Sequence, residues 1–118
     1  MGFNLKDLGK KVTDSIPRPI SFVNVVFRFS VGPAEKYILK DPLKVRADGA
    51  EIAKVDPESS VTVKLKEGSR LLRLWFESQG KEKGVVDSTV NLSKGNNYEV
   101  SYQYSVTSNS GRITVRTI

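Results

Sequence analysis

The stretch SFVNVVFRFSV, residues 21–31, sets the period that most of the chain follows. Its odd positions from 23 to 31 are Val, Val, Phe, Phe and Val, while polar residues stand between them at 24, 28 and 30. Side chains of a strand point alternately to its two faces, so this alternation predicts a long strand with one buried face. Gly32-Pro33 ends it.

The same period of two continues along the chain. LKVRADGAEIAKV, 43–55, predicts two short strands joined at Asp48-Gly49. SVTVKLKEGSRLLRLWFES, 60–78, alternates on both sides of Glu67-Gly68 and predicts a hairpin. The residues expected on the inner face of this hairpin are Val61, Val63, Leu65, Leu72, Leu74 and Phe76.

Weaker signals complete the strand pattern. A less regular strand is expected around Tyr37 to Leu39, and QGKEKG, 79–84, is expected to be a polar loop before the strand VVDSTVNL. A long strand then places apolar or aromatic residues on one face, and GRITVRTI, 111–118, supplies the last strand. The residues of that face are Tyr98, Val100, Tyr102, Tyr104 and Val106, which we expect to be core rather than a stacking surface.

With 118 residues the chain makes one domain. Seven or eight strands at short intervals predict that residues 20–118 form an all-β domain, an antiparallel β-sandwich of the immunoglobulin-like kind. Residues 1–19 are expected to form one N-terminal amphipathic α-helix followed by a proline-containing linker, because the period there is helical and Pro17 and Pro19 end it.

The apolar stripe of that helix consists of Leu5, Leu8, Val12 and Ile16. Such a short helix is marginal alone, so its stripe must be buried against its own sandwich, a second copy, a partner or a membrane. Four apolar residues without tryptophan make a weak lipid face, and Asp7 and Asp14 oppose anionic headgroups. We therefore expect burial on protein, with weak peripheral membrane contact as the alternative.

The middle of the chain resembles a PEGA-type repeat, a small β-sandwich module of bacterial envelope and surface proteins. The positions that carry the resemblance are Val45-Arg46-Ala47-Asp48-Gly49 and Leu65-Lys66-Glu67-Gly68-Ser69-Arg70, and it covers roughly residues 43–77. Glu67 stands where the family has proline, and no Pro-Glu-Gly-Ala tetrad occurs. The resemblance implies a non-catalytic scaffold or adhesion role and transfers no binding residues.

Catalysis is limited by elimination. The chain has no His and no Cys, which excludes a Ser-His-Asp triad, a Cys-His pair and a histidine-ligated zinc. Asp48, Glu51, Asp56 and Glu58 lie in adjoining turns, but they lack the spacing of an EF-hand, so we expect turn formers rather than calcium ligands. We expect no cofactor and no enzymatic activity.

The net charge of +6 permits binding to polyanions, although nineteen basic residues are mixed with thirteen carboxylates. Candidate anion-binding residues are Arg70, Arg112 and Arg116, near lysines 64 and 66 if their strands are neighbours. A basic module that binds nucleic acid is therefore the alternative function.

The leading hypothesis is a non-catalytic interaction or scaffold module with a protein partner or a second copy. Leu71, Arg73 and Trp75 share the face opposite Leu72 and Leu74, and such a row on a free surface suggests cover by the helix or a partner. The sequence contains no membrane-spanning run or signal-peptide pattern, and it has no cysteine. We expect a cytoplasmic protein, with envelope association as the alternative.

Overall fold

The computed structural model describes residues 21–118. The expected N-terminal helix and its stripe, Leu5, Leu8, Val12 and Ile16, lie outside these residues. The described part contains the strands β1 (Phe22–Ser30), β2 (Leu43–Ala47), β3 (Ala50–Val55), β4 (Ser60–Lys66), β5 (Gly68–Ser78), β6 (Lys81–Leu92), β7 (Tyr98–Ser105) and β8 (Ser110–Thr117). No helix in residues 21–118 is long and apolar enough to cross a membrane.

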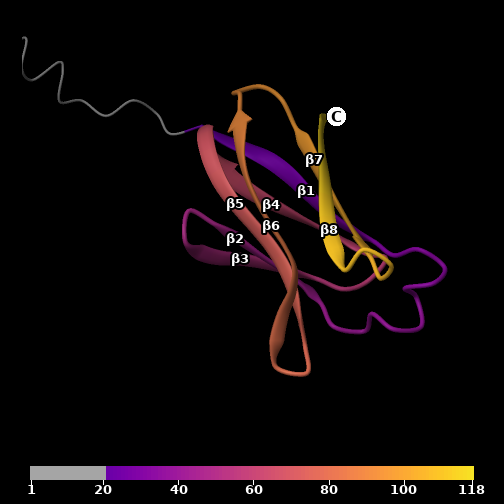
Figure 1. Cartoon of the computed structure of the whole chain (residues 1–118). Helices are drawn as coiled ribbons and strands as arrows, with labels where there is room; N and C mark the ends of the chain where they lie inside the picture. Colours follow the sequence, from indigo (N-terminus) through magenta and orange to yellow (C-terminus); the bar gives the residue numbers. More distant parts are fainter. Residues whose placement is uncertain (1–20) are drawn as a thin grey trace, which may run out of the picture.

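The strands form two four-stranded sheets that pack against one another (Figure 1). Sheet A has the order β4-β1-β7-β8, and sheet B has the order β3-β2-β5-β6. Neighbouring strands are antiparallel except β1 and β7, which run parallel. The chain changes sheet between β1 and β2, between β3 and β4, between β4 and β5, and between β6 and β7. The predicted all-β architecture is thus observed.

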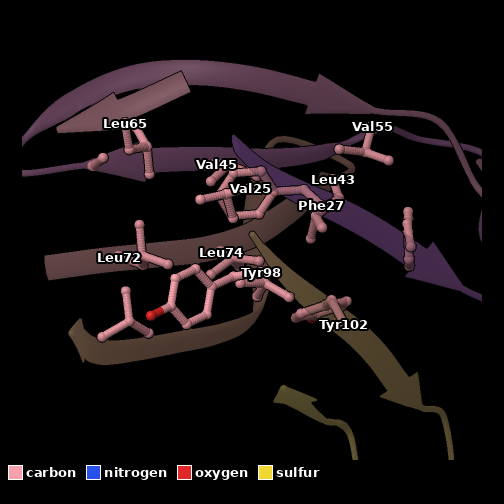
Figure 2. Close-up of a cluster of buried hydrophobic side chains, with 14 of the residues drawn as sticks. Val25, Phe27, Leu43, Val45, Val55, Leu65, Leu72, Leu74, Tyr98 and Tyr102 are labelled. Atoms are coloured by element: carbon pink, nitrogen blue, oxygen red, sulfur yellow. The ribbon is translucent and has the colours of Figure 1, made fainter. Parts of the chain in front are cut away.

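The core lies between the two sheets and is built from the alternating positions. In β1, Val23, Val25, Phe27 and Phe29 are buried, as the period of two predicts. Figure 2 shows side chains from both sheets meeting there, with the labelled residues Val25, Phe27, Leu65, Tyr98 and Tyr102 from sheet A and Leu43, Val45, Val55, Leu72 and Leu74 from sheet B. The tyrosine strand is therefore a core strand, as expected, although Val106 lies beyond it in the β7–β8 turn and is 39% exposed.

The hairpin predicted at Glu67-Gly68 is not formed. Strand β4 pairs with β1, while β5 pairs with β2 and β6, so the chain crosses from one sheet to the other at this point. Gly68 has a φ of 105°, a conformation that side chains disfavour. The predicted inner residues still face the core, because alternation specifies which face of a strand is buried but not which strand lies beside it.

Three other predicted segments show how far short-range sequence signals determine the local structure. The predicted β2–β3 turn is confirmed, with positive φ at both Asp48 and Gly49, as a two-residue hairpin of this type requires. The polar loop predicted at 79–84 is wrong in extent: Gln79-Gly80 makes the turn, and Lys81 already begins β6. The irregular strand predicted at Tyr37–Leu39 is a turn in which only Leu39 is buried.

The strand order departs from the predicted immunoglobulin-like kind. A constant-type immunoglobulin domain orders its strands A-B-E-D and C-F-G, so that its first strand lies beside its second. Here β1 lies between β4 and β7, and β2 belongs to the other sheet. Two packed sheets were predictable from the alternating pattern, whereas their strand order depends on long-range pairing.

Two glycines close one side of the sandwich, where the edge strands β6 and β8 approach each other. Gly84 has a φ of 61° and sits at a bulge of β6 opposite Trp75. The Tyr102 hydroxyl reaches across from β7 and donates a hydrogen bond to the Gly84 carbonyl oxygen at 2.6 Å. A Cβ added to Gly111 would lie 2.5 Å from that same oxygen, so only glycine allows this approach.

Candidate interaction surfaces

The outer face of sheet B carries the row predicted from the sequence. We call this surface the sheet B face; β2 and β5 supply its centre, with Lys44 opposite Trp75 and Arg46 opposite Arg73. Leu71 lies on the same face, two residues before Arg73. The structure therefore brings together the three candidate partner-binding residues Leu71, Arg73 and Trp75 on one surface.

Trp75 differs from the exposed row that was expected, because only 2% of it is accessible. It does not belong to the core between the sheets. The Arg46 guanidinium carbon lies 4.9 Å from the centre of the indole ring, so a cation from the neighbouring strand covers its outer side. The indole Nε1 has no hydrogen-bond partner among residues 21–118. Sequence spacing alone could not reveal this cover, since Arg46 is 29 positions away in the chain.

Leu71 stays open on this face, with 54% of its surface exposed. It borders a hollow of about 410 Å³ that is also lined by Arg46, Gly49, Arg73 and Asp87. The sheet B face is therefore a shallow site with an apolar edge and charged walls.

The charged wall of the hollow is fixed by one ion pair. Arg73 Nε donates to Asp87 Oδ1 at 2.8 Å, and Nη2 donates to Oδ2 at 3.1 Å. The hydrogen bond from Arg73 lowers the pKa of Asp87, and the same pair raises the pKa of Arg73. A two-point contact between planar groups holds both side chains in one orientation. The hollow consequently has a defined shape before anything binds.

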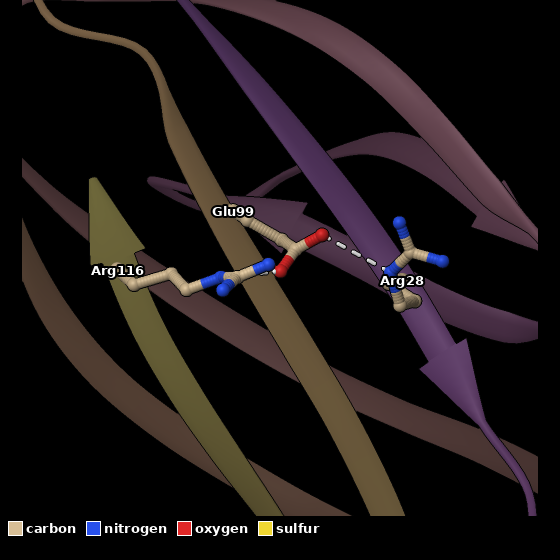
Figure 3. Close-up of polar contacts among 3 residues, drawn as sticks. All are labelled: Arg28, Glu99 and Arg116. Carbon is tan, nitrogen blue, oxygen red and sulfur yellow. Dashed lines mark hydrogen bonds and ion pairs between the residues drawn. The ribbon is translucent and has the colours of Figure 1, made fainter. Parts of the chain in front are cut away.

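The outer face of sheet A, which we call the sheet A face, carries a different cluster. Glu99 on β7 lies between Arg28 on β1 and Arg116 on β8 (Figure 3). Arg116 Nε donates to Glu99 Oε1 at 2.7 Å, and Arg28 Nε donates to Oε2 at 3.1 Å. These hydrogen bonds, that of Arg116 foremost, lower the pKa of Glu99. Only 6% of Glu99 is exposed, although it lies on an outer face.

The predicted anion-binding set is only partly brought together. Arg112 and Arg116 both point outward on β8, as expected from their spacing. Arg70 does not join them, because it lies in sheet B and donates to Asp48 Oδ2 at 3.0 Å. Its partner Asp48 also accepts a hydrogen bond from the Leu71 amide. Arg70 therefore fixes the β2–β3 turn, and placing it with the other two arginines was wrong.

Sequence reasoning missed Arg28 and Glu99 as members of a charged cluster. Each stands at an outward position of its strand, which the alternation of residues along the strand predicts. Their proximity could not be predicted from the sequence, because 71 positions separate them and only the parallel pairing of β1 with β7 brings them together. The charged residues of the sheet A face thus differ from the predicted anion-binding set: Arg112 and Arg116 remain, Arg70 is absent, and Arg28 and Glu99 are added.

Two further hollows lie at the end where the β1–β2 loop and the β7–β8 turn meet. One, of about 390 Å³, is polar and includes Glu35 and Arg112. Both are already engaged, since Glu35 accepts a hydrogen bond from the Val106 amide and Arg112 contacts Gln103 at 3.4 Å. The other, of about 280 Å³, is bordered by Ile38, which is 61% exposed.

The acidic residues considered as calcium ligands do not gather. Among residues 21–118, no three acidic side chains come close enough to hold a metal ion. Asp48, the first of the four, is occupied by Arg70 and by the Leu71 amide. Asp87 on the sheet B face and Glu99 on the sheet A face are each held by arginine in ion pairs.

Comparison with known proteins adds no family to this description. No protein-family model matches the sequence, and a search of curated proteins finds no significant match.

Proposed function

We propose that this chain is a non-catalytic interaction module whose sheet B face binds an amphipathic helix, first of all the helix expected at residues 4–16. The observation that carries the proposal is Leu71, half exposed beside the hollow bordered by Arg46 and Arg73. A stripe of four apolar residues needs an apolar contact, and Leu71 offers one beside rigid charged groups. The helix packs there within one molecule or between two copies, and the second arrangement gives a scaffold role.

The path of the chain supports this assignment. The carbonyl oxygen of Ser21 accepts a hydrogen bond from the Glu67 amide at 2.9 Å, so the described chain begins beside the start of β5. Leu71 is three residues beyond Gly68, or about 10 Å along the strand. The four residues between the expected helix and the described chain, 17–20, can span about 13 Å when extended. The C-terminal end of the expected helix is therefore within reach of Leu71.

A mutant cycle in the full-length chain tests the contact. Full burial of leucine contributes about 1.5 to 3 kcal/mol, and roughly half of this remains available at Leu71. We expect Leu8→Glu and Leu71→Glu each to lower the free energy of unfolding by about 1 kcal/mol, with the double variant costing clearly less than their sum. Chemical denaturation measures all four proteins.

The matched control is Ile38→Glu, which changes an exposed apolar residue at the opposite, loop-bearing end. Its effect should add to that of Leu8→Glu because the two positions are not expected to touch. Sedimentation at several concentrations then separates packing within one molecule from packing between two copies. Full additivity of Leu8→Glu and Leu71→Glu refutes the proposed contact, and loss of binding to anionic vesicles in Leu8→Glu would identify a membrane anchor instead.

A further inference from the structure

Positive charge is concentrated on the sheet A face. Its outward positions include five cations and the carboxylate of Glu99. The cations are Lys64 and Lys66 on β4, Arg28 on β1, and Arg112 and Arg116 on β8. Five positive charges against one negative charge leave four of the chain's net +6 on a single sheet face. Such a face attracts polyanions from a distance.

Glu99 fixes the geometry of two of these cations. Both Arg28 and Arg116 use Nε to contact it, and among residues 21–118 neither guanidinium makes another hydrogen bond. Their side chains remain 50% and 66% exposed. The terminal nitrogens of both guanidinium groups are therefore available on a surface where the side chains are already ordered. Ordering before binding reduces the entropy cost of each new contact.

The remaining outward residues are suited to phosphate rather than to bases or lipid. Between the cations stand small hydrogen-bonding side chains, namely Asn24, Thr62, Ser101, Gln103 and Thr114. Proteins position nucleic-acid backbones with this combination of Arg, Lys, hydroxyl and amide groups. A single-strand platform would need exposed aromatic rings among the cations, and the aromatic residue of this face, Phe22, lies at its edge beside Lys66.

We propose that the sheet A face binds the phosphate backbone of a nucleic-acid duplex without reading its sequence. The contacts come from Lys64, Lys66, Arg28 and Arg116, since Arg112 already uses a terminal guanidinium nitrogen to contact Gln103 at 3.4 Å. A lipid surface fits less well, because peripheral membrane faces insert apolar or aromatic side chains and the centre of this face has only Val26, which is partly buried. The role is independent of helix binding on sheet B.

Salt dependence of binding to a fluorescent DNA duplex of about 20 base pairs tests the proposal in the full-length protein. Four phosphate contacts predict a slope of about −3.6 in log affinity against log salt, or about 150-fold weaker binding at 200 mM than at 50 mM. Lys64→Ala should make the slope shallower by about 1. The combined variant Arg28→Ala, Glu99→Ala, Arg116→Ala should make it shallower by about 2, without leaving an unpaired buried carboxylate.

Lys36→Ala is the control, because it removes one exposed positive charge in the β1–β2 loop, away from this face. It should leave the slope unchanged, and thermal unfolding checks that each variant is folded. Equal weakening by Lys64→Ala and Lys36→Ala would show attraction by net charge alone and overturn the proposal. Tighter binding to single strands than to the duplex overturns the choice of duplex, and binding to anionic vesicles without duplex binding overturns the choice of nucleic acid.

Discussion

Substituting Gly84 tests the closure of the sandwich between β6 and β8. A Cβ added at Gly84 would lie 2.1 Å from the Tyr102 hydroxyl oxygen and 2.9 Å from Tyr104 Cδ1. The residue also has a φ of 61°, which costs a non-glycine residue about 1 to 2 kcal/mol. Overpacking adds about 1 to 3 kcal/mol. We therefore expect Gly84→Ala to lower the free energy of unfolding by about 2 to 5 kcal/mol.

Tyr102→Phe separates the two causes. By itself it leaves the partly buried Gly84 carbonyl without its donor, which costs about 1 to 3 kcal/mol. In the double variant, however, the atom nearest to the new Cβ is gone, and the next Tyr102 atom is no closer than 3.2 Å. The steric part of the Gly84→Ala cost should then fall, while the cost of positive φ remains. We expect the double variant to be more stable than additivity predicts by about 0.5 to 3 kcal/mol.

Urea denaturation followed by tryptophan fluorescence measures this cycle, because Trp75 lies opposite the Gly84 bulge and reports on it. Gly49→Ala is the matched control: Gly49 also has positive φ, but a Cβ there meets nothing within 4 Å. It should show the cost of strain without a steric part and without coupling to Tyr102→Phe. Strict additivity of Gly84→Ala and Tyr102→Phe would refute the contact on which this reasoning depends.

Three further outcomes are expected. Leu74→Ala should cost about 2 to 5 kcal/mol in urea denaturation, whereas Thr62→Ala on the outer face should cost less than about 1, and equal costs would mean that the strand faces are assigned wrongly. Because arginine contacts lower the pKa of Glu99, the contribution of its carboxylate to stability is present above the ordinary pKa of 4.5 and is lost as the pH falls. Glu99→Gln should therefore flatten the acid limb of stability against pH. Burial raises the pKa of Tyr102, so the contribution of its neutral hydroxyl to stability is full below pH 10 and is lost as the pH rises above that value. Tyr102→Phe should therefore flatten the alkaline limb of stability against pH, and an unchanged limb contradicts the assignment.

Much of each strand could be predicted because its signal is local. A period of two requires only neighbouring residues, and it placed the buried faces of β1, β5 and β7 correctly. The Asp48-Gly49 turn was equally readable, since two adjacent residues supply the required backbone conformations. The outward row of Leu71, Arg73 and Trp75 follows from the same alternation. These features would be expected in any fold that buried the same faces.

The candidate sites were less predictable, because they depend on which strands are neighbours. Glu99 meets Arg28 only because β1 and β7 pair in parallel. Arg46 lies over the Trp75 ring only because β2 pairs with β5. Arg70 left the expected basic cluster because β5 and β8 belong to different sheets. In each case the deciding contact joins residues far apart in the chain.

The sequence by itself determined that this chain is all-β between residues 21 and 118, which side of each strand faces the core, and where the tightest hairpin turns. Only the tertiary structure decided that Glu67-Gly68 crosses between sheets, that β1 lies between β4 and β7, and that Gly84 and Gly111 let two edge strands approach. The reason is physical. Alternation and turn conformation act within a few residues, whereas strand order is selected by the joint closure of one core, to which every strand contributes and which no single stretch encodes.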